Sequence, residues 1–231
     1  MLSKNVKKAL LIGSAHSNNI LGLSQILIEN GIAPRALMLR LKSPLDQGNF
    51  RLSKMLLRGI EWIERDEWPR ALEIAQKMAQ DGEMIIPEGA DMPEAFAGAQ
   101  TLAEDIKRNE ERLGLKFAHI FLDAGTGLAA RAAILGLRGE NRHFHVVKAS
   151  PYAKLPKGDD ISHYKPSICP SFGSSNRQLL SFMRDFTYKE GIFLDPLYTG
   201  KLFFEAKRLS PILKGPVLIV HSGNSLSFVN N

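Results

Sequence analysis

Two loops of the sequence combine small and polar residues in a way that suits the binding of an anion. Residues 13–20 (GSAHSNNI) follow an apolar run and precede a helical pattern, so their Ser-Asn-Asn run offers donors at a helix start. Residues 123–130 (DAGTGLAA) follow another apolar run, and their small side chains would let a phosphate approach the backbone. Ser17 could equally be only a helix cap, and no Gly-Lys-Ser/Thr follows the second loop as in a P-loop. Each loop predicts an anion site without identifying the anion.

Two further segments put hydroxyl groups at the ends of apolar stretches. Tyr198 and Thr199 lie in residues 191–201 (GIFLDPLYTGK), and Ser222 follows the strand-like residues 217–221 (VLIVH). A tyrosine after Asp-Pro is more often a packing residue at a helix start than an acid. Taken alone, either segment therefore predicts a structural role.

Short β-like runs alternate with longer helical patterns along the chain, which predicts the α/β class with a parallel sheet. Leu23 and Ile28 are expected to face inward on the first helix, and Leu72 on a later one. Residues 150–176, rich in Pro, Gly and Ser, are expected to form a long functional loop. Ligands of such folds bind at the carboxyl ends of the strands, where both anion loops fall. Strands are expected at residues 9–13, 35–39, 59–64, 84–87, 117–123, 143–150 and 216–222.

Composition excludes several classes of protein. The 231 residues are 44% hydrophobic, enough for a packed core, and the longest apolar runs fall short of the roughly 20 residues that span a bilayer. The net charge of +6 arises from 30 basic and 24 acidic residues that mix along the chain, which argues against nucleic acid. The single Cys169 excludes an intrachain disulfide and a multi-cysteine metal site. We expect a cytoplasmic protein with no metal and no membrane partner.

Taken together and in this order, the four segments resemble fold type II pyridoxal-phosphate enzymes, specifically the family of 1-aminocyclopropane-1-carboxylate deaminase and D-cysteine desulfhydrase. The resemblance runs from Leu10 to Asn224, and residues 87–90 (PEGA) look like the PEGG segment of that family. It implies a tryptophan synthase β-like fold of two three-layer α/β domains with mainly parallel sheets. The smaller domain would comprise residues 1–103 and the larger 104–231, with pyridoxal 5'-phosphate in the cleft between them. The resemblance also implies a homodimer.

The resemblance implies a role for each matched residue. Ser17 would be the hydroxyl that binds the substrate carboxylate or transfers a proton, Asn18 would reach the 3-oxygen of the cofactor, and Asn19 would lie at the helix start. Tyr198 matches the active-site tyrosine. Ser222 matches a Thr or Ser that faces the pyridine nitrogen, where a neutral hydroxyl leaves the ring less protonated than an Asp would. The phosphate cup would consist of Gly125, Thr126, Gly127, Leu128 and Ala129.

Position 199 separates two branches of the family, since the deaminases resemble YEGK and the desulfhydrases YTGK. Thr199 favours the desulfhydrase branch: elimination from D-cysteine, a small amino-acid substrate, to pyruvate, ammonia and sulfide. The alternatives are ring-opening deamination of 1-aminocyclopropane-1-carboxylate and a non-catalytic relative that binds an anionic metabolite. Four departures bear on the substrate: Phe172 stands where a second tyrosine is common, Leu128 replaces a glycine or small residue, Asp123 adds an anion, and residues 223–225 (GNS) replace the usual double glycine after Ser222.

A further departure concerns the lysine that holds the cofactor. In this family the Schiff-base lysine lies in a GNK-like segment about one helix before the loop that matches GSAHSN, whereas 12 residues precede Gly13 here. Lys4, Lys7 and Lys8 are at the wrong distance and read as a solvated helix end. The expectation is an N-terminally incomplete fold and an inactive chain, explained by a late gene start, which we favour, or by decay.

Overall fold

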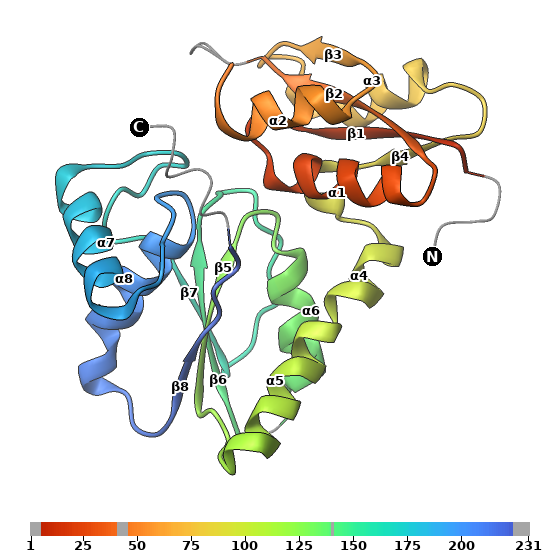
Figure 1. Ribbon diagram of the computed structural model, residues 1–231. Coiled ribbons are helices and arrows are strands. Elements are labelled where there is room, and N and C mark those ends of the chain that lie inside the picture. The colour runs from red at the N-terminus through yellow and green to blue at the C-terminus, as the bar shows by residue number, and fades with distance from the viewer. Residues whose placement is uncertain (1–5, 41–45, 140, 224–231) are drawn as a thin grey trace. The chain divides into compact units, whose positions relative to one another are not determined.

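The computed structural model describes residues 6–40, 46–139 and 141–223 (Figure 1). The chain folds into two compact units that divide between Glu94 and Ala95. The expected domain bounds, 1–103 and 104–231, would put the division within helix α5 (Thr101–Leu113).

Unit 1 is built on a parallel four-stranded sheet in the order β3-β2-β1-β4. Its central strands are apolar on both faces, as expected when helices cover both sides. Because all strands are parallel, the segments that follow them leave from one edge of the sheet. The strands are β1 (Lys8–Ser14), β2 (Ala33–Leu39), β3 (Ile60–Ile63) and β4 (Glu83–Ile86).

Helices cover both faces of this sheet. Leu10 and Ile12 pack with Ala71 and Ala75 of α3, while Gly13 lies so close to Ile20 of α1 that a Cβ there would be 2.9 Å from the Ile20 Cδ1 atom. The inward positions differ in part from those expected, because α1 buries Ser24, whereas Ile28 and Leu72 are exposed. The helices are α1 (Asn18–Glu29), α2 (Gly48–Leu56), α3 (Ala71–Met78) and the short η1 (Trp68–Arg70) and η2 (Glu88–Ala90).

Unit 2 contains the second parallel sheet, in the order β7-β6-β5-β8. Strand β7 falls within residues 150–176, which were expected to form a loop. The expectation was wrong there because β7 is a short, half-buried edge strand with the polar sequence ISHY and so lacks an apolar run. The strands are β5 (His119–Ala124), β6 (His143–Lys148), β7 (Ile161–Tyr164) and β8 (Val217–Ile219).

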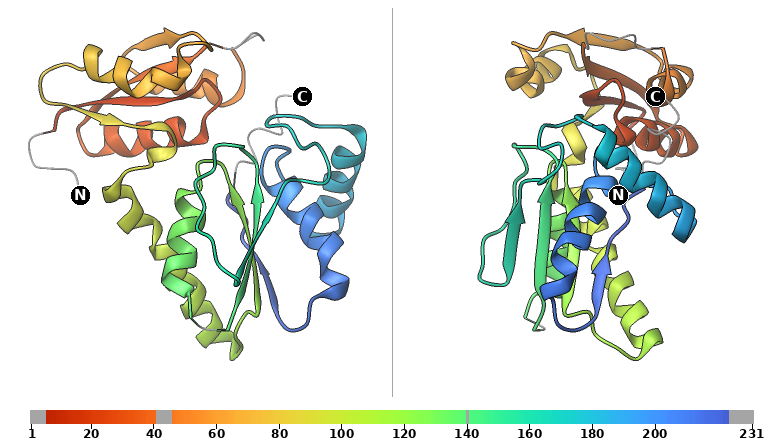
Figure 2. Two further views of the ribbon diagram at one scale, coloured as in Figure 1. Left: turned by 180° about the vertical axis from the view of Figure 1, so that it is seen from behind. Right: turned by 90° about the vertical axis from the view of Figure 1, so that its left-hand side faces the viewer.

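Helices α5 and α6 pack on one face of this sheet, and α8 packs on the other, with α7 against α8 (Figure 2). Alternation along β5 sends Ile120 and Leu122 to the first face and Phe121 to the second. A buried ion pair between Glu110 and Arg142 joins α5 to the start of β6. The helices are α4 (Pro93–Ala99), α5, α6 (Leu128–Leu137), α7 (Arg177–Glu190), α8 (Thr199–Leu209) and the short η3 (Ser210–Ile212).

Within the described residues, no helix has the length and apolar character needed to cross a bilayer. The same residues contain no group of three or more His, Cys, Asp or Glu side chains that could hold a metal ion.

Candidate functional site

Segments that are distant in sequence meet at the carboxyl edge of the unit 2 sheet. Strands β5 and β8 are parallel neighbours, with Phe121 aligned to Ile219, so the residues that follow both strands leave from this edge. The Ser222 hydroxyl donates a hydrogen bond of 2.6 Å to the Asp123 carboxylate, which joins the two strand ends. The α/β architecture therefore brings together two of the predicted site segments.

The glycine loop between β5 and α6 has a backbone shape that other residues would not accept. Gly127 has φ of 94°, and a Cβ on it would lie 2.3 Å from the Lys154 carbonyl oxygen. The Lys154 N–H in turn donates to the Thr126 carbonyl oxygen at 2.9 Å. Gly127 caps α6 without a side-chain hydrogen bond, and the first turn of α6 holds no acidic residue. The backbone N–H groups of Leu128 and Ala129 at this helix start suit an anion.

Tyr198 and Phe172 lie beside the same loop. A Cβ on Gly125 would lie 3.4 Å from both the Cε1 and hydroxyl oxygen atoms of Tyr198, so the phenol is in contact distance of the loop. The Phe172 ring meets the Tyr198 ring edge-on, with centroids 6.2 Å apart, and is 52% exposed. Three residues assigned to the site from the sequence are thus neighbours.

A buried carboxylate, which sequence reasoning missed, positions Tyr198. Asp195 accepts hydrogen bonds from the backbone N–H groups of Leu197 at 2.8 Å, Tyr198 at 2.7 Å and Thr199 at 2.9 Å. The Thr199 hydroxyl also donates to Asp195 at 2.6 Å, and accepts from the Asp195 N–H at 2.8 Å. Thr199 is fully buried. The family resemblance also implies that Thr199 contacts the cofactor, and that role remains a prediction. The signal for Asp195 was an Asp-Pro pair before a helix start, where a carboxylate often caps.

The environment of Asp123 makes its protonation unusual. Burial, and to a smaller extent the negative charge of Asp195, raise the pKa of the Asp123 carboxyl, which is about 6 overall. The hydrogen bond from Ser222 and the nearby His221 act in the opposite direction and lower it. Asp123 therefore changes its charge close to neutral pH.

A buried lysine, also missed from the sequence, holds the loop that carries Phe172. Lys201 is 1% exposed, and its Nζ donates to the Ser171 carbonyl oxygen at 2.9 Å. Burial lowers the pKa of the Lys201 amine, with partial compensation from Cys169 and Asp195. Because Ser171 is 30 residues away in sequence, local pattern offered no signal for this contact.

The second part of the predicted site belongs to unit 1, at the carboxyl edge of its own sheet. The Ser17 hydroxyl accepts a hydrogen bond of 3.2 Å from the Ile20 N–H and so caps α1. The Asn18 side-chain oxygen accepts from the side-chain amide of Asn49, which also donates to the His16 carbonyl oxygen at 3.2 Å. Asn19 is half-buried in the first turn.

Asn49 was not anticipated, because the sequence SPLDQGN at residues 43–49 predicted a polar loop, whereas α2 begins at Gly48. It is buried, and its side-chain oxygen has no hydrogen-bond partner among the described residues. Of the four loops predicted to converge, those with Gly125, Tyr198 and Ser222 meet in unit 2. Participation of the Ser17 loop remains a prediction, and Asn224 lies outside the described residues.

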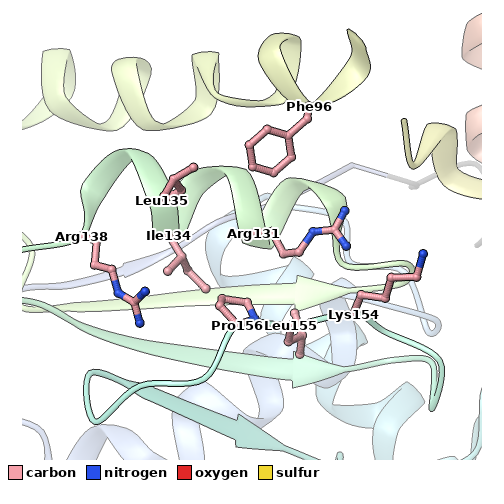
Figure 3. Close-up of a pocket in the computed structure, with 8 residues that line it drawn as sticks. All are labelled: Phe96, Arg131, Ile134, Leu135, Arg138, Lys154, Leu155 and Pro156. Carbon is pink, nitrogen blue, oxygen red and sulfur yellow. The ribbon is translucent and has the colours of Figure 1, made fainter. Parts of the chain in front are cut away.

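A separate pocket of about 500 Å³ lies along the outer side of α6 (Figure 3). It contains none of the residues assigned to the site from the sequence. Arg138 at one end is paired with Asp160 at 3.4 Å and with the Lys157 carbonyl oxygen at 2.9 Å. The pocket is bounded by Phe96, Arg131, Ile134, Leu135, Arg138, Lys154, Leu155 and Pro156.

Comparisons with known proteins agree with this architecture. No protein-family model matches the chain. A Pyrococcus horikoshii protein, provisionally named as a 1-aminocyclopropane-1-carboxylate deaminase, is 28% identical over 96% of this chain and 75% of its own length. The crystal structure of an ACC deaminase homologue superimposes with a TM-score of 0.77 at 22% identity, covering 96% of this chain and 75% of that one. A hydrogen sulfide-producing enzyme from Fusobacterium nucleatum gives a TM-score of 0.63 at 14% identity, covering 95% of this chain and 79% of that one.

Two parallel four-stranded sheets with flanking helices, shared with these structures, give the chain the fold of type II pyridoxal-phosphate enzymes. Within that fold, the chain is similar to the family of 1-aminocyclopropane-1-carboxylate deaminase. Enzymes of this family depend on pyridoxal phosphate.

The donor groups at the edge of unit 2 fit the phosphate and the ring of this cofactor. The uncapped start of α6 and the Thr126 hydroxyl suit the phosphate, and the Ser222 hydroxyl suits a ring nitrogen. Lys7 and Lys8 were read as a solvated helix end, but they lie at and just before the first residue of β1, a strand end. Both side chains are exposed there.

Proposed function

We propose that the protein binds pyridoxal 5'-phosphate and, when an amine takes the role of the Schiff-base lysine, acts on a small amino acid by α,β-elimination, with D-cysteine as the leading substrate; without such an amine the 231-residue chain is expected to be inactive. D-cysteine and one water would give pyruvate, ammonia and hydrogen sulfide. The observation that carries the proposal is the meeting of Gly125, Tyr198, Phe172 and Ser222 at one edge of the unit 2 sheet. A homodimer and a cytoplasmic location are part of the proposal.

The phosphate half of the site would use backbone donors. The N–H groups of Leu128 and Ala129 and the Thr126 hydroxyl would bind the phosphate, and Gly127 would keep the loop closed against Lys154. Ser222 would face the pyridine nitrogen. When bound, the cofactor supplies an electron sink that stabilises negative charge at the α-carbon of an amino acid.

The substrate half would use hydroxyl and amide groups. Ser17, with Asn19 and the start of α1, would bind the substrate carboxylate, and Asn18 would bind the 3-oxygen of the cofactor. The Tyr198 phenol would deliver a proton to the sulfur that leaves the β-carbon. The capping of α1 by Ser17 supports this role because it fixes the direction of the hydroxyl.

Two residues favour elimination of sulfide over opening of a cyclopropane ring. Phe172 contacts Tyr198 where a second phenol would otherwise be available to move a proton. Position 199 is a threonine and so supplies no carboxylic acid to the site, and its hydroxyl donates a hydrogen bond to Asp195. Hydrosulfide is a better leaving group than a ring carbon, which needs more proton transfer and a deeper electron sink.

Substrate preference can be measured on a single preparation of the chain loaded with pyridoxal phosphate, with methylamine as an external amine. We expect sulfide from D-cysteine, and chloride from β-chloro-D-alanine, to form at least about tenfold faster than ammonia from 1-aminocyclopropane-1-carboxylate, a barrier difference of about 1.4 kcal/mol. The chloro compound serves because it has no thiol to add to the cofactor aldehyde.

The same amine and cofactor without protein give the background rate. Comparable or reversed rates for the two substrates would favour the deaminase alternative. Cofactor binding with no product above background would favour the third candidate, a non-catalytic protein that binds an anionic metabolite.

A further inference from the structure

The Asp123 carboxylate stands directly behind the Ser222 hydroxyl. The two side chains are joined by the 2.6 Å hydrogen bond in which Ser222 donates. Ser222 is exposed and Asp123 is half-buried, so the hydroxyl lies on the side open to a ligand and the carboxylate on the inner side. The arrangement couples a titratable group to a hydroxyl that a ligand can reach.

His221 holds the turn that presents Ser222. Its Nε2 donates to the Phe193 carbonyl oxygen at 2.8 Å, since a carbonyl can only accept. Its Nδ1 then accepts from the Gly223 N–H at 3.2 Å. Both ring nitrogens are engaged, so the turn that carries Ser222 is fixed from two sides.

The charge of Asp123 decides which way the Ser222 hydroxyl points. When Asp123 is ionised, Ser222 donates to it, and the hydroxyl oxygen offers only lone pairs to a ligand. When Asp123 is protonated, the carboxyl can donate to Ser222, whose own hydrogen is then free to donate outward. The pKa of about 6 puts this change near neutral pH, and the titratable groups that bear on Asp123 are Asp195 and His221.

We propose that Asp123 acts through Ser222 to keep a heteroaromatic ring nitrogen protonated, as a positioning residue for the ligand of this site. This inference rests on the proposed function, which puts the cofactor ring at Ser222. It also reverses the expectation that a lone neutral hydroxyl leaves the ring poorly protonated. Ser222, and not an Asp, would face the ring nitrogen, but the Asp123 carboxylate lies directly behind Ser222 and is hydrogen-bonded to its hydroxyl.

The probe for this test is 4'-deoxypyridoxine 5'-phosphate labelled with ¹⁵N in the ring, which lacks the aldehyde and needs no lysine. Its ¹⁵N shift in complex with the 231-residue chain reports the protonation of the ring nitrogen across pH 5 to 9. We expect Asp123→Asn, and separately Ser222→Ala, to lower the proton affinity of the bound ring nitrogen at least about tenfold. The double variant should show no larger drop than either single one, because both act through one hydrogen bond.

Ser222→Thr keeps the hydroxyl and should retain the wild-type shift, and Asp159→Asn removes an exposed carboxylate as a matched control. Circular dichroism and thermal unfolding establish that each variant is folded. Binding with an unchanged ring-nitrogen titration in folded Asp123→Asn would overturn the inference and leave the proposed function intact. Failure of the wild-type chain to bind the probe at any pH would instead overturn the proposed function, and the inference with it.

Discussion

Single residues at the strand ends carry structural and proposed chemical roles at once, and Ser17 is the clearest example. Its hydroxyl caps α1 by accepting from the Ile20 N–H. The same hydroxyl is proposed to meet the substrate. A substitution that removes the hydroxyl therefore affects stability and chemistry together, unless the two are separated by design.

Glycine and alanine at position 17 separate the two roles. Ser17→Ala should lower the free energy of unfolding by about 1 kcal/mol, whereas Ser17→Gly should lower it by only a few tenths, because glycine tolerates the cap position. Both variants should lose at least about tenfold in sulfide release if the hydroxyl takes part in catalysis. Urea unfolding and the methylamine-supplied assay measure the two effects. A wild-type rate in Ser17→Gly would reduce Ser17 to a helix cap.

The sequence was informative about residues whose role depends on their neighbours along the chain. Gly125 and Tyr198 lie in short motifs after apolar runs, and the structure brings them into contact. The sequence did not predict the roles of Lys201 and Asn49, because their hydrogen-bond partners, the carbonyl oxygens of Ser171 and His16, are distant in sequence. Burial of a lysine is a property of the fold, which no local pattern records.

At the scale of elements, the parallel strands were predicted well where both of their faces are buried. β1, β5 and β6 are apolar runs, which predicted their positions within one or two residues. The sequence did not predict β7 or α2, for two different reasons. β7 is a polar edge strand, and α2 begins at Gly48, a residue more typical of a turn.

A chain of hydrogen bonds runs across strands β5, β6 and β7 beneath α8. His119 bonds through Nε2 to the Lys214 carbonyl oxygen at 3.2 Å and through Nδ1 to His145 Nε2 at 3.0 Å, and His145 Nδ1 meets the Tyr164 hydroxyl at 3.0 Å. The carbonyl at one end fixes the direction of donation when both rings are neutral. Burial, with smaller contributions from the nearby His143 and His119, lowers the pKa of His145 to about 4.

The histidine chain predicts that acid weakens the fold. Between pH 6.5 and 4 the unfolded chain binds a proton at His145 and the folded chain does not. The contribution of neutral His145 to the free energy of unfolding is therefore fully present above pH 6.5 and is lost as the pH falls toward 4. It amounts to about 3 kcal/mol. The raised pKa of Asp123 acts in the opposite direction, since the folded chain holds that proton more tightly.

The difference in the free energy of unfolding between wild type and His145→Phe separates the effect of His145 from that of Asp123, because both proteins contain Asp123. We expect the stability advantage of wild type in urea unfolding to shrink by about 3 kcal/mol from pH 7.5 to 4. His163→Asn, at an exposed position on β7, is the matched control and should follow the wild-type curve. A constant difference between wild type and His145→Phe across this range would show that His145 is not the titrating group.

At the scale of the whole molecule, the two units contain separate sheets with separate carboxyl edges. The alternation of β-like runs and helical patterns gave the α/β class correctly, and the family resemblance gave the fold, because it rests on the order of segments along the chain. Periodicity alone could not assign the functional residues of unit 1 and unit 2 to one ligand. That assignment requires chemical evidence of ligand binding. The most direct evidence would be to find which lysine, if any, forms a covalent bond with the cofactor.

Position argues against Lys7 and Lys8 as that lysine. Lys8 begins β1, and its Nζ donates to the Gln80 side chain at 2.7 Å. At about 3.3 Å per residue, β1 extends roughly 20 Å from there to the edge where the Ser17 loop begins. Lys4 lies outside the described residues. Lys201, near the unit 2 site, has its Nζ buried and bonded to Ser171.

We therefore expect the 231-residue chain to bind pyridoxal phosphate without a stoichiometric covalent adduct. The chain would be mixed with the cofactor, reduced with borohydride and mapped by mass spectrometry, with Gly127→Ala as a control because a Cβ there collides with the Lys154 carbonyl oxygen. Sparse adducts on exposed lysines should be equal in wild type and control. A stoichiometric adduct on Lys4, Lys7 or Lys8, accompanied by turnover without methylamine, would show that the lysine has been misplaced. An adduct on Lys201 that is lost in Gly127→Ala would instead identify the buried amine as the one that holds the cofactor.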